Sequence, residues 1–369
     1  MFISRNNNKN NLYFMKLAFN QAQKNLGNTK ENPSVGCVIL RNGHLIGSVY
    51  TGFNGRPHAE INAINFTKLN LNNSSMYVTL EPCSHTGKTE PCAELILKHG
   101  LKNVFISSVD KNKIVDGKGI KKLKQNNVTV KFVRNKKINL INDIFFNSIN
   151  KKKPFLTLKI ASTIDSKIAT SNFESKWITS KASRLIGHSL RFRNDCLLTT
   201  SQTVLKDNPL LDCRLEGLEN YSPDIFILDR ELKIDLSKNI FKKKNRKVFI
   251  LHNIDPKKIK SAKYKKKKIE LISISKSNGY LDIKKVIRKI ADYGYQSILV
   301  EGGGKISASL LSNDLVDNIY WFKASKFIGQ EGISAIEKLG IHNMKSIKKF
   351  NLSKVTKLED DTLNIFIKK

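Results

Sequence analysis

Two short segments carry the strongest signal in this chain: PHAE at residues 57–60 and EPCSHTGKTEPC at residues 81–92. They supply one imidazole, from His58, and two thiols, from Cys83 and Cys92. Three protein ligands of this kind are what a catalytic zinc ion needs if its fourth position is to hold water. The two segments therefore predict a catalytic zinc site.

Glu60 follows His58 by two residues and is predicted to lie beside the ion without binding it. In zinc deaminases such a glutamate moves protons to the leaving amine, so the pattern predicts hydrolytic deamination of an amino-substituted ring. Two other interpretations compete with this one. The cysteines can be buried small hydrophobes beside a surface histidine. A structural zinc is the stronger rival, but such sites usually pair two cysteines within two to four residues, whereas a long insert separates Cys83 from Cys92.

The length of 369 residues favours two domains, each large enough to bury its own core. A boundary is expected at the basic linker 151–154, after a helix-like segment at 138–149, which gives domains at 1–152 and 153–369. No apolar run is long enough to cross a bilayer, and residues 1–11 are too polar for a signal peptide. These features predict a cytoplasmic protein without membrane association.

Five cysteines are an odd number, and their scattered positions do not resemble a disulfide framework. This usage agrees with a reducing compartment. Cys37 lies in the apolar run 35–40 and is predicted to belong to the core.

The net charge of +34 would ordinarily indicate a nucleic-acid partner. However, the excess is mostly lysine, it is spread along the whole chain, and it accompanies abundant asparagine and isoleucine. We therefore interpret it as a compositional bias, and a nucleic-acid partner is not expected.

The first half shows alternating helix and strand patterns, which predict a three-layer α/β sheet with the site at strand ends. A helix is expected at 12–26 and a strand hairpin at 35–40 and 45–50. Further strands are expected at 75–80, 104–108 and 128–133, with helices from 57 to 69 and from 93 to 99.

The second half has a different α/β pattern, with no internal repeat. Helices are expected at 181–192 and 281–293, and strands at 155–161, 196–200, 224–228, 248–251, 297–300, 319–322 and 363–367. The segment SILVEGGGK at 297–305 predicts a strand, a glycine turn and a helix at 306–311, where backbone amides can approach a phosphate. A tight turn without a ligand is an equal alternative. Arg191 and Arg214 are candidates to fork a substrate phosphate, with an ordinary surface role as the alternative for each.

Together these motifs resemble the bifunctional riboflavin-biosynthesis family, in which a pyrimidine deaminase is fused to a 5-amino-6-(5-phosphoribosylamino)uracil reductase. The resemblance runs from about Tyr13 to the carboxyl terminus. Its most specific parts are the two opening segments, NPSVG at 32–36, SKWITS at 175–180, DNPLLDCR at 207–214 and VEGG at 300–303.

For the first half, the resemblance implies a cytidine-deaminase-like fold with zinc on His58, Cys83 and Cys92 and with Glu60 as proton shuttle. The implied substrate is 2,5-diamino-6-(5-phosphoribosylamino)pyrimidin-4(3H)-one. The long insert between the cysteines is the family's form, whereas tRNA and DNA deaminases carry a Cys-x-x-Cys pair. Two insert residues are expected to face the substrate, with a solvated loop as the alternative: His85 and Lys88.

For the second half, the resemblance implies a dihydrofolate-reductase-like α/β fold that binds NADPH and reduces the ribosyl carbon to a ribityl chain. The matching cofactor positions are Ala161, Trp177, Thr203, Asp207, Gly303, Gly304, Lys305, Ile306, Ser307, Ala308 and Ser309. The matching substrate positions are Ser175, Arg191, Leu211, Arg214 and Glu301. No general acid is assigned.

Three positions depart from the family's pattern. Thr51 stands where a histidine is usual, which puts one deaminase substrate contact in doubt, and Ser166 stands where a glycine usually follows Asp165. The segment DKNK at 110–113 replaces a turn with two prolines. None of these departures removes a predicted zinc ligand or Glu60.

Two alternatives to a bifunctional enzyme stay open at this point. One is a basic tRNA- or DNA-associated zinc deaminase with an accessory domain. The other is a chain in which one half has become a structural partner. The sequence does not decide between a monomer and a homo-oligomer.

Overall fold

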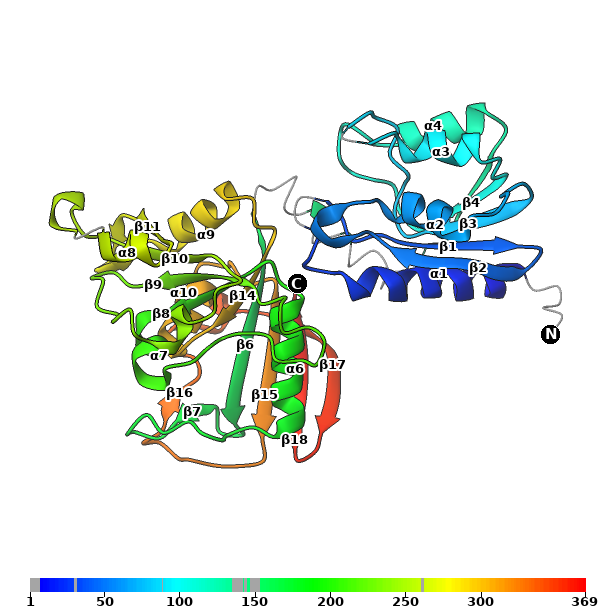
Figure 1. Cartoon of the computed structure of the whole chain (residues 1–369). Coiled ribbons are helices and arrows are strands. Elements are labelled where there is room, and N and C mark those ends of the chain that lie inside the picture. The colour runs from blue at the N-terminus through cyan, green and yellow to red at the C-terminus, as the bar shows by residue number, and fades with distance from the viewer. Residues whose placement is uncertain are drawn as a thin grey trace. The chain divides into compact units, whose positions relative to one another are not determined.

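The computed structural model describes residues 7–29, 32–87, 89–134, 142, 145–146, 153–259 and 262–369. The chain divides into two compact units, Met1–Lys153 and Pro154–Lys369, and each is described by itself (Figure 1). The helix expected at 138–149 falls largely outside the described residues, and Lys88 lies outside them as well. Among the described residues, no helix has the length and apolar character needed to cross a membrane.

The first unit is a five-stranded sheet between two helical layers, as expected. The strands follow the order β2-β1-β3-β4-β5. Its strands are β1 Gly36–Arg41, β2 His44–Tyr50, β3 Ser74–Val78, β4 Asn103–Ile106 and β5 Thr129–Phe132, and its helices are α1 Asn7–Lys24, α2 Ala59–Thr67, α3 Cys92–Lys98 and α4 Lys118–Gln125. β1 is antiparallel to β2 and β3, whereas β3, β4 and β5 are parallel. Figure 1 shows α1 on one face of the sheet and α2, α3 and α4 on the other.

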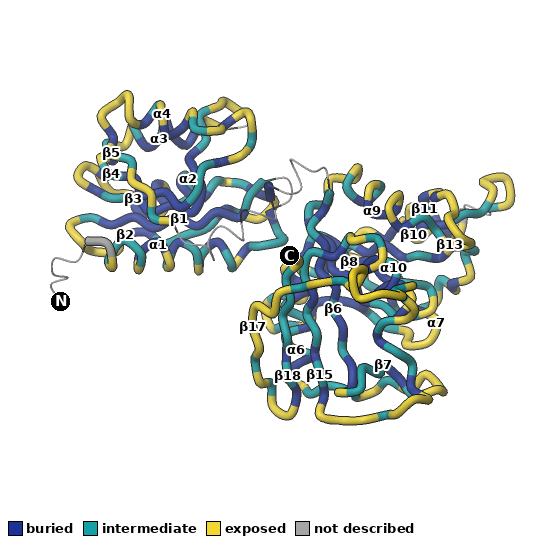
Figure 2. The backbone as a smooth tube through the Cα atoms, turned by 180° about the vertical axis from the view of Figure 1, so that it is seen from behind, coloured by how far each residue is buried: buried dark blue, intermediate teal, exposed yellow. Residues whose placement is uncertain are grey.

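Both faces of β1 are buried, because its side chains alternate between two cores (Figure 2). Cys37 and Ile39 belong to the core that includes residues of α2, α3 and α4. Val38 and Leu40 pack with residues of α1 on the opposite face. Gly36, which begins β1, permits this close approach, because a Cβ there would lie 1.8 Å from the Ala18 carbonyl oxygen of α1.

The second unit is built on a nine-stranded sheet in the order β11-β10-β9-β8-β14-β6-β15-β18-β17. Its strands are β6 Phe155–Thr163, β8 Cys196–Thr200, β9 Asp224–Leu228, β10 Val248–His252, β11 Ile269–Ser273, β14 Ser297–Glu301, β15 Asn318–Ala324, β17 Phe350–Leu358 and β18 Asp361–Lys368, with short pairs formed by β7 Lys167–Ala169 and β16 Ile333–Ser334, and by β12 Lys276–Ser277 and β13 Tyr280–Leu281. Its helices are α6 Lys181–Phe192, α7 Ser201–Asp207, α8 Ala262–Lys266, α9 Ile283–Asp292 and α10 Gly304–Ser312. Residues of α9 and α10 pack in one apolar core, and Leu190 of α6 and Tyr264 of α8 pack in another. β15 runs antiparallel to β18, and β18 runs antiparallel to β17, so the last two strands form a hairpin at one edge of the sheet.

Several elements were missed by the sequence analysis, among them β11 and β17, the two edge strands of the nine-stranded sheet. The others include α4, α7 and β7, none of which is longer than eight residues, so each offers too few residues for a decisive periodic pattern. α1 begins before the expected start at residue 12, because the pattern marked only the packed part, whose buried residues include Phe14, Met15 and Ala18. α10 begins at Gly304, two residues before the expected helix.

Ser166 keeps the backbone that a glycine would favour at its position. Its φ is 63°, in the left-handed region where a side chain is strained. Two backbone hydrogen bonds hold it there, since Ser166 N–H donates to Thr163 O over 3.0 Å and Ala335 N–H donates to Ser166 O over 2.9 Å. The departure from glycine therefore leaves this turn in place.

Candidate functional site

The first unit brings the three predicted zinc ligands together. His58 caps the start of α2, Cys92 opens α3, and Cys83 lies in the loop that follows β3. His58 Nδ1 lies 3.6 Å from Cys83 Sγ and 3.4 Å from Cys92 Sγ. One ligand atom from each residue lies within 4.8 Å of the others. Such convergence of one nitrogen and two sulfurs suits a tetrahedral zinc ion with one open position.

The protonation chemistry of these ligands also suits a metal ion. The neighbouring Cys92 thiol, followed by His58 and the Cys92 backbone N–H, lowers the pKa of Cys83 despite its burial. The Cys92 N–H donates to Cys83 Sγ over 3.4 Å. A zinc ligand must be a thiolate, so the site already favours the binding form of one cysteine. The other ring nitrogen of His58, Nε2, is buried without a hydrogen-bond partner among the described residues, which leaves Nδ1 as the atom that faces the sulfurs.

Glu60 is buried, with 4% of its surface exposed, in the first turn of α2. Burial raises the pKa of its carboxyl group to about 7. Together with His58, Cys83 and His85 it lines a cavity of about 130 Å³. The structure thus places an acid–base group at the proposed metal position, and it places His85, one of the two predicted insert residues, at the same cavity.

Thr51 also lines this cavity, but its side chain is bound to the backbone of Val35. The hydroxyl oxygen accepts from Val35 N–H over 2.9 Å and lies 3.3 Å from the Val35 carbonyl oxygen. The threonine therefore supports the loop before β1. The Thr51 hydroxyl is bound to the Val35 backbone, so these hydrogen bonds do not replace the substrate contact that a histidine would make at this position.

Glu81 is a residue of this site whose contribution the sequence analysis missed. Its buried carboxylate accepts three backbone N–H groups, from Asp110 at 3.1 Å, Gly117 at 3.0 Å and Ile120 at 3.1 Å. Gly117 caps α4 and Ile120 lies in its first turn, so Glu81 ties the Cys83 loop to the start of α4. Its position directly before Pro82 and Cys83 was the feature of the sequence that could have indicated a role at this site.

The second unit contains a cavity of about 360 Å³ at the carboxyl ends of β8 and β14. It brings together eleven of the predicted cofactor and substrate positions: Ala161, Trp177, Thr203, Asp207, Gly303, Gly304, Ser175, Arg191, Leu211, Arg214 and Glu301. The remaining predicted positions do not line it: Lys305, Ile306, Ser307, Ala308 and Ser309. Because α10 starts at Gly304, it presents its first backbone groups to the cavity, and its later side chains turn into the core or to solvent.

A buried ion cluster lies at one side of this cavity. Arg191 Nε and Nη2 donate to the two carboxylate oxygens of Glu301 over 2.6 and 3.0 Å, and Lys159 Nζ lies 3.4 Å from the same carboxylate. Parallel pairing of β14 with β6 places Glu301 directly beside Lys159. Burial alone would raise the pKa of Glu301, but the two cations outweigh it and lower the pKa to about 2.

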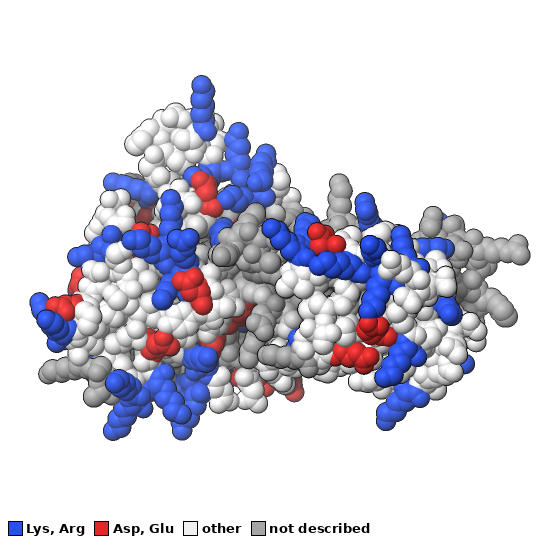
Figure 3. Space-filling view, turned by 90° about the horizontal axis from the view of Figure 1, so that it is seen from above, with Lys and Arg blue, Asp and Glu red and all other residues white. Residues whose placement is uncertain are grey.

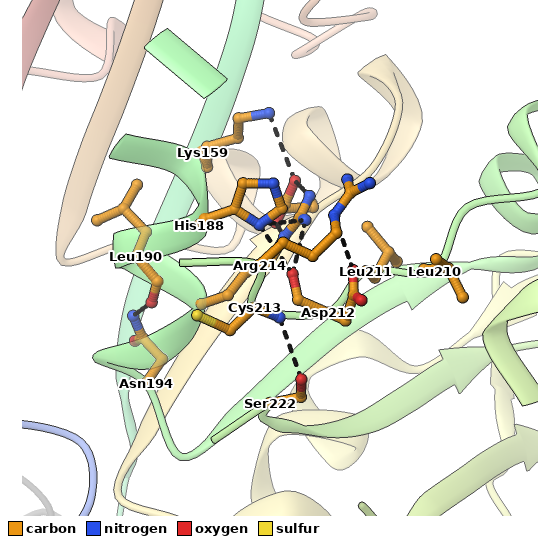
Figure 4. Close-up of polar contacts among 12 residues, drawn as sticks. Lys159, His188, Leu190, Asn194, Leu210, Leu211, Asp212, Cys213, Arg214 and Ser222 are labelled. Carbon is orange, nitrogen blue, oxygen red and sulfur yellow. Dashed lines mark hydrogen bonds and ion pairs between the residues drawn. The ribbon is translucent and has the colours of Figure 1, made fainter. Parts of the chain in front are cut away.

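This arrangement corrects the expectation that the guanidinium group of Arg191 binds a substrate phosphate through two hydrogen bonds. The edge of its guanidinium formed by Nε and Nη2 is occupied by Glu301, and Nη1 donates to the Asp212 carbonyl over 3.0 Å. Arg214, in contrast, has a side chain that is 60% exposed, and within the described part of the chain its ion pair is with Asp212, over 3.3 Å. Figure 4 shows the dashed contact that joins Arg214 to Asp212. Arg214 is the better candidate for an anionic ligand group.

Two further basic residues were missed because neither belongs to a motif. Lys159 lies in the middle of β6, and the apolar residues around it indicated a strand but gave no sign of a functional lysine. Arg246 donates to the carbonyls of Leu211, Leu210 and Ile240 over 2.8, 2.6 and 2.8 Å. Leu211 has a φ of 49°, so the half-buried Arg246 holds the cavity loop in a left-handed conformation.

The glycine turn fits a ligand that approaches the backbone. A Cβ added at Gly303 would meet no atom within 4 Å, although the residue lines the cavity and caps α10. Open space at the start of a helix is where a phosphate can be bound by backbone N–H groups. The side chains of Thr203 and Trp177 line the same cavity, which gives the polar and aromatic surfaces that a dinucleotide requires.

Comparisons with known proteins cover nearly the whole chain. The model of the RibD C-terminal domain matches residues 154–363, and the model of the cytidine and deoxycytidylate deaminase zinc-binding region matches residues 8–108. The riboflavin biosynthesis protein RibD of Aquifex aeolicus (strain VF5) is 35% identical over 357 residues, which are 96% of this chain and 98% of that protein. The protein of the same name from Escherichia coli (strain K12) is 27% identical and covers 95% of this chain and 97% of its own.

Solved structures give the same result. The crystal structure of a diaminohydroxyphosphoribosylaminopyrimidine deaminase/5-amino-6-(5-phosphoribosylamino)uracil reductase from Thermotoga maritima superposes with a TM-score of 0.85 and 30% identity. That match covers 98% of this chain and 100% of the other. Acinetobacter baumannii RibD, form 1, superposes with a TM-score of 0.86 and 28% identity, covering 98% and 99%.

Proposed function

This chain belongs to the RibD family of bifunctional deaminase–reductases of riboflavin biosynthesis, and we propose how its residues divide the two reactions. The chain is an enzyme that acts on a small-molecule pyrimidine substrate. In the proposal, residues 1–152 form the zinc-dependent deaminase and residues 153–369 form the NADPH-dependent reductase. The deaminase acts first, on 2,5-diamino-6-(5-phosphoribosylamino)pyrimidin-4(3H)-one.

The deaminase proposal depends on one observation, the convergence of His58 Nδ1 and the two cysteine sulfurs beside a buried carboxylate. His58, Cys83 and Cys92 would hold zinc, which supplies a Lewis acid that activates water for attack on the amino-bearing carbon. Glu60 takes a proton and delivers it to the leaving amine. His85 lies at the cavity and contacts the substrate, and the same role is proposed for Lys88.

The reductase proposal rests on the cavity that gathers eleven predicted positions. The bound NADPH supplies the hydride, and the protein orients it against the ribosyl carbon. Ala161, Trp177, Thr203, Asp207 and the turn 303–304 would contact the cofactor. The substrate positions are Ser175, Arg191, Leu211, Arg214 and Glu301, with Arg191 acting through Glu301 and Arg214 binding the phosphate.

The proposal extends to the cellular location of the chain and to its partner. None of the five cysteines, all of which the structure describes, forms a disulfide, which supports the proposal of a reducing compartment and a cytoplasmic location. Lys and Arg side chains are distributed over both units on the face shown in Figure 3, with acidic side chains among them, and no single stripe gathers them. We infer a small-molecule partner in preference to nucleic acid, because the lysine excess is spread along the whole chain.

Metal removal tests the assignment of the two reactions to the two parts of the chain. Ammonia release from the diaminopyrimidine nucleotide and NADPH oxidation with the uracil intermediate are followed separately, before and after zinc is removed by a chelator. We expect ammonia release to be lost and restored by added zinc, because the water needs a Lewis acid. NADPH oxidation should be unchanged. A chelated chain that still releases ammonia, or a loaded chain that never oxidises NADPH, would contradict the proposal.

Arg214→Ala tests the phosphate assignment. We expect the KM for the uracil substrate to rise about tenfold or more, because a charge-assisted hydrogen bond contributes about 1.5–3 kcal/mol. The KM for NADPH should change little. Arg288→Ala, which removes an exposed arginine from α9 away from the cavity, is the matched control. A larger effect on the NADPH KM than on the substrate KM would refute the assignment.

A further inference from the structure

One face of α6 lines the reductase cavity. The cavity residues of α6 follow the spacing of a single helix face: Ser183, Arg184, Gly187, His188 and Arg191. Arg191 is bound to Glu301, and Arg184 lies over the ring of Trp177, with its guanidinium carbon 4.4 Å from the ring centroid. The Ser183 hydroxyl donates to the carboxylate of Asp361 over 2.5 Å. The function proposed above assigns no role to His188, the remaining side chain with hydrogen-bonding atoms on this face.

The imidazole of His188 is held in one orientation. Its Nδ1 lies 3.0 Å from the carbonyl oxygen of Asp212. Arg191 Nη1, which only donates, lies 3.4 Å from the same ring nitrogen, but it already donates to the Asp212 carbonyl over 3.0 Å. A carbonyl oxygen only accepts hydrogen bonds, so the shorter contact, between Nδ1 and the Asp212 carbonyl, places the proton of the neutral ring on Nδ1. Burial, with the positive charges of Arg191 and Arg214, lowers the pKa of His188, which favours this neutral form.

The other ring nitrogen is then an acceptor at the cavity. In Figure 4 it points away from the Asp212 carbonyl, and no dashed line reaches it. Within the described ranges, no hydrogen bond involves His188 Nε2, and this atom is not among the buried atoms without a partner. A neutral Nε2 can only accept, so it suits a ligand group that donates.

Gly187 leaves room for that group beside the ring. A Cβ at this position would meet no atom within 4 Å, although the residue is buried and lines the cavity. A glycine inside a helix lowers helix stability by about 1 kcal/mol relative to alanine. Helix stability therefore does not explain why a glycine occupies this position. The open space and the acceptor lie on neighbouring residues of the same face.

We propose that His188 is a substrate-contacting residue that selects the ribosyl chain by accepting a hydrogen bond from one of its hydroxyl groups, in the space left by Gly187. This inference rests on the proposed reductase function. The phosphate of the substrate has only acceptor oxygens when ionised, so it cannot be the group that faces a neutral Nε2. The hydroxyls of the pentose donate, whereas the nearby Lys159, Arg191 and Arg214 are donors that cannot receive them.

A pair of substitutions separates substrate contact from simple bracing of the Asp212 loop. His188→Asn keeps a donor near the position of Nδ1 and loses the acceptor at Nε2, whereas His188→Gln places an amide oxygen near Nε2 and loses the brace. We expect His188→Asn to lower kcat/KM for the uracil substrate about tenfold. His188→Gln should stay closer to the unaltered chain, and the KM for NADPH should be unchanged in both. A bracing role predicts the opposite order, and that order, or an unaltered His188→Asn, would overturn the proposal.

Gly187→Ala gives a second measurement that does not depend on a weakened fold. Alanine should stabilise α6, and its methyl group should fill the space beside His188. We expect a higher melting temperature together with a raised substrate KM. Both tryptophans, Trp177 and Trp321, lie in the second unit, so their fluorescence reports the melting of this unit alone. A stabilised variant with an unchanged substrate KM would count against the subsite.

These outcomes differ from failure of the function itself. If the unaltered chain does not oxidise NADPH with the uracil intermediate, the reductase proposal fails. If it does so and His188→Asn equals it, only the role of His188 fails.

Discussion

Glu60→Gln should abolish ammonia release while zinc stays bound. The substitution removes the group that moves protons to the leaving amine, but it removes none of the three proposed ligands. Because a positioned acid–base group contributes about 10²–10⁴-fold to a rate, deamination should fall by at least about two orders of magnitude. Ammonia release measures the reaction, and metal analysis of the same preparation measures the zinc.

The chain supplies its own controls for this experiment. NADPH oxidation with the uracil intermediate should be unchanged in Glu60→Gln, since the described residues that line the cavity of the second unit all belong to that unit. Glu94→Gln removes a carboxylate from α3 that binds Lys122 and does not line the deaminase cavity, and it should deaminate normally. Normal ammonia release by Glu60→Gln with full zinc content would remove Glu60 from the mechanism.

The deaminase site was predictable because its chemistry is concentrated in short motifs. His58 and Cys92 each begin a helix, and Cys83 follows a strand, so local sequence signals already placed them at element ends. Glu81 was missed because its three hydrogen-bond donors lie far along the chain, at Asp110, Gly117 and Ile120. Only the folded backbone brings those N–H groups to one carboxylate.

The reductase cavity was predictable as a set of positions, but its internal pairing was not. Strand register, which no motif encodes, places Lys159 beside Glu301 and makes that carboxylate the partner of Arg191 as well. Five cofactor positions that the resemblance implies, 305–309, do not line the cavity, because α10 directs their side chains into the core or to solvent. A match to a family's positions does not state which side of a helix faces the cavity.

Arg191→Met should destabilise the second unit, because it leaves Glu301 as a buried charge with only Lys159 to compensate it. The side chains of Arg191 and Glu301 are 13% and 9% exposed, so water can replace little of the lost interaction. Removing one partner of a buried pair typically costs about 3–5 kcal/mol. Urea unfolding followed by tryptophan fluorescence measures the free energy of unfolding of this unit, since both tryptophans lie in it.

The pH dependence of that loss distinguishes an unpaired charge from a packing defect. In the unaltered chain the pKa of Glu301 is lowered to about 2, so the pair stabilises the fold above the ordinary glutamate pKa, and this contribution is lost as pH falls towards 2. Without Arg191, burial becomes the dominant cause and should raise the pKa of Glu301 above its unfolded value. The variant is then most stable at low pH and weakens as pH rises through the new pKa, so its deficit should be smaller at about pH 5 than at about pH 8.

Arg191→Met combined with Glu301→Gln provides the matched control, because it removes both charges of the pair. An amide needs less solvation than a carboxylate, so the double variant should recover much of the stability lost in the single one, and its stability should depend less on pH. The loss of stability in the double variant should therefore be smaller than the sum of the losses caused by the two substitutions separately. Equal losses in the single and double variants, at either pH, would show that Arg191 contributes mainly through packing and that Glu301 does not need its charge.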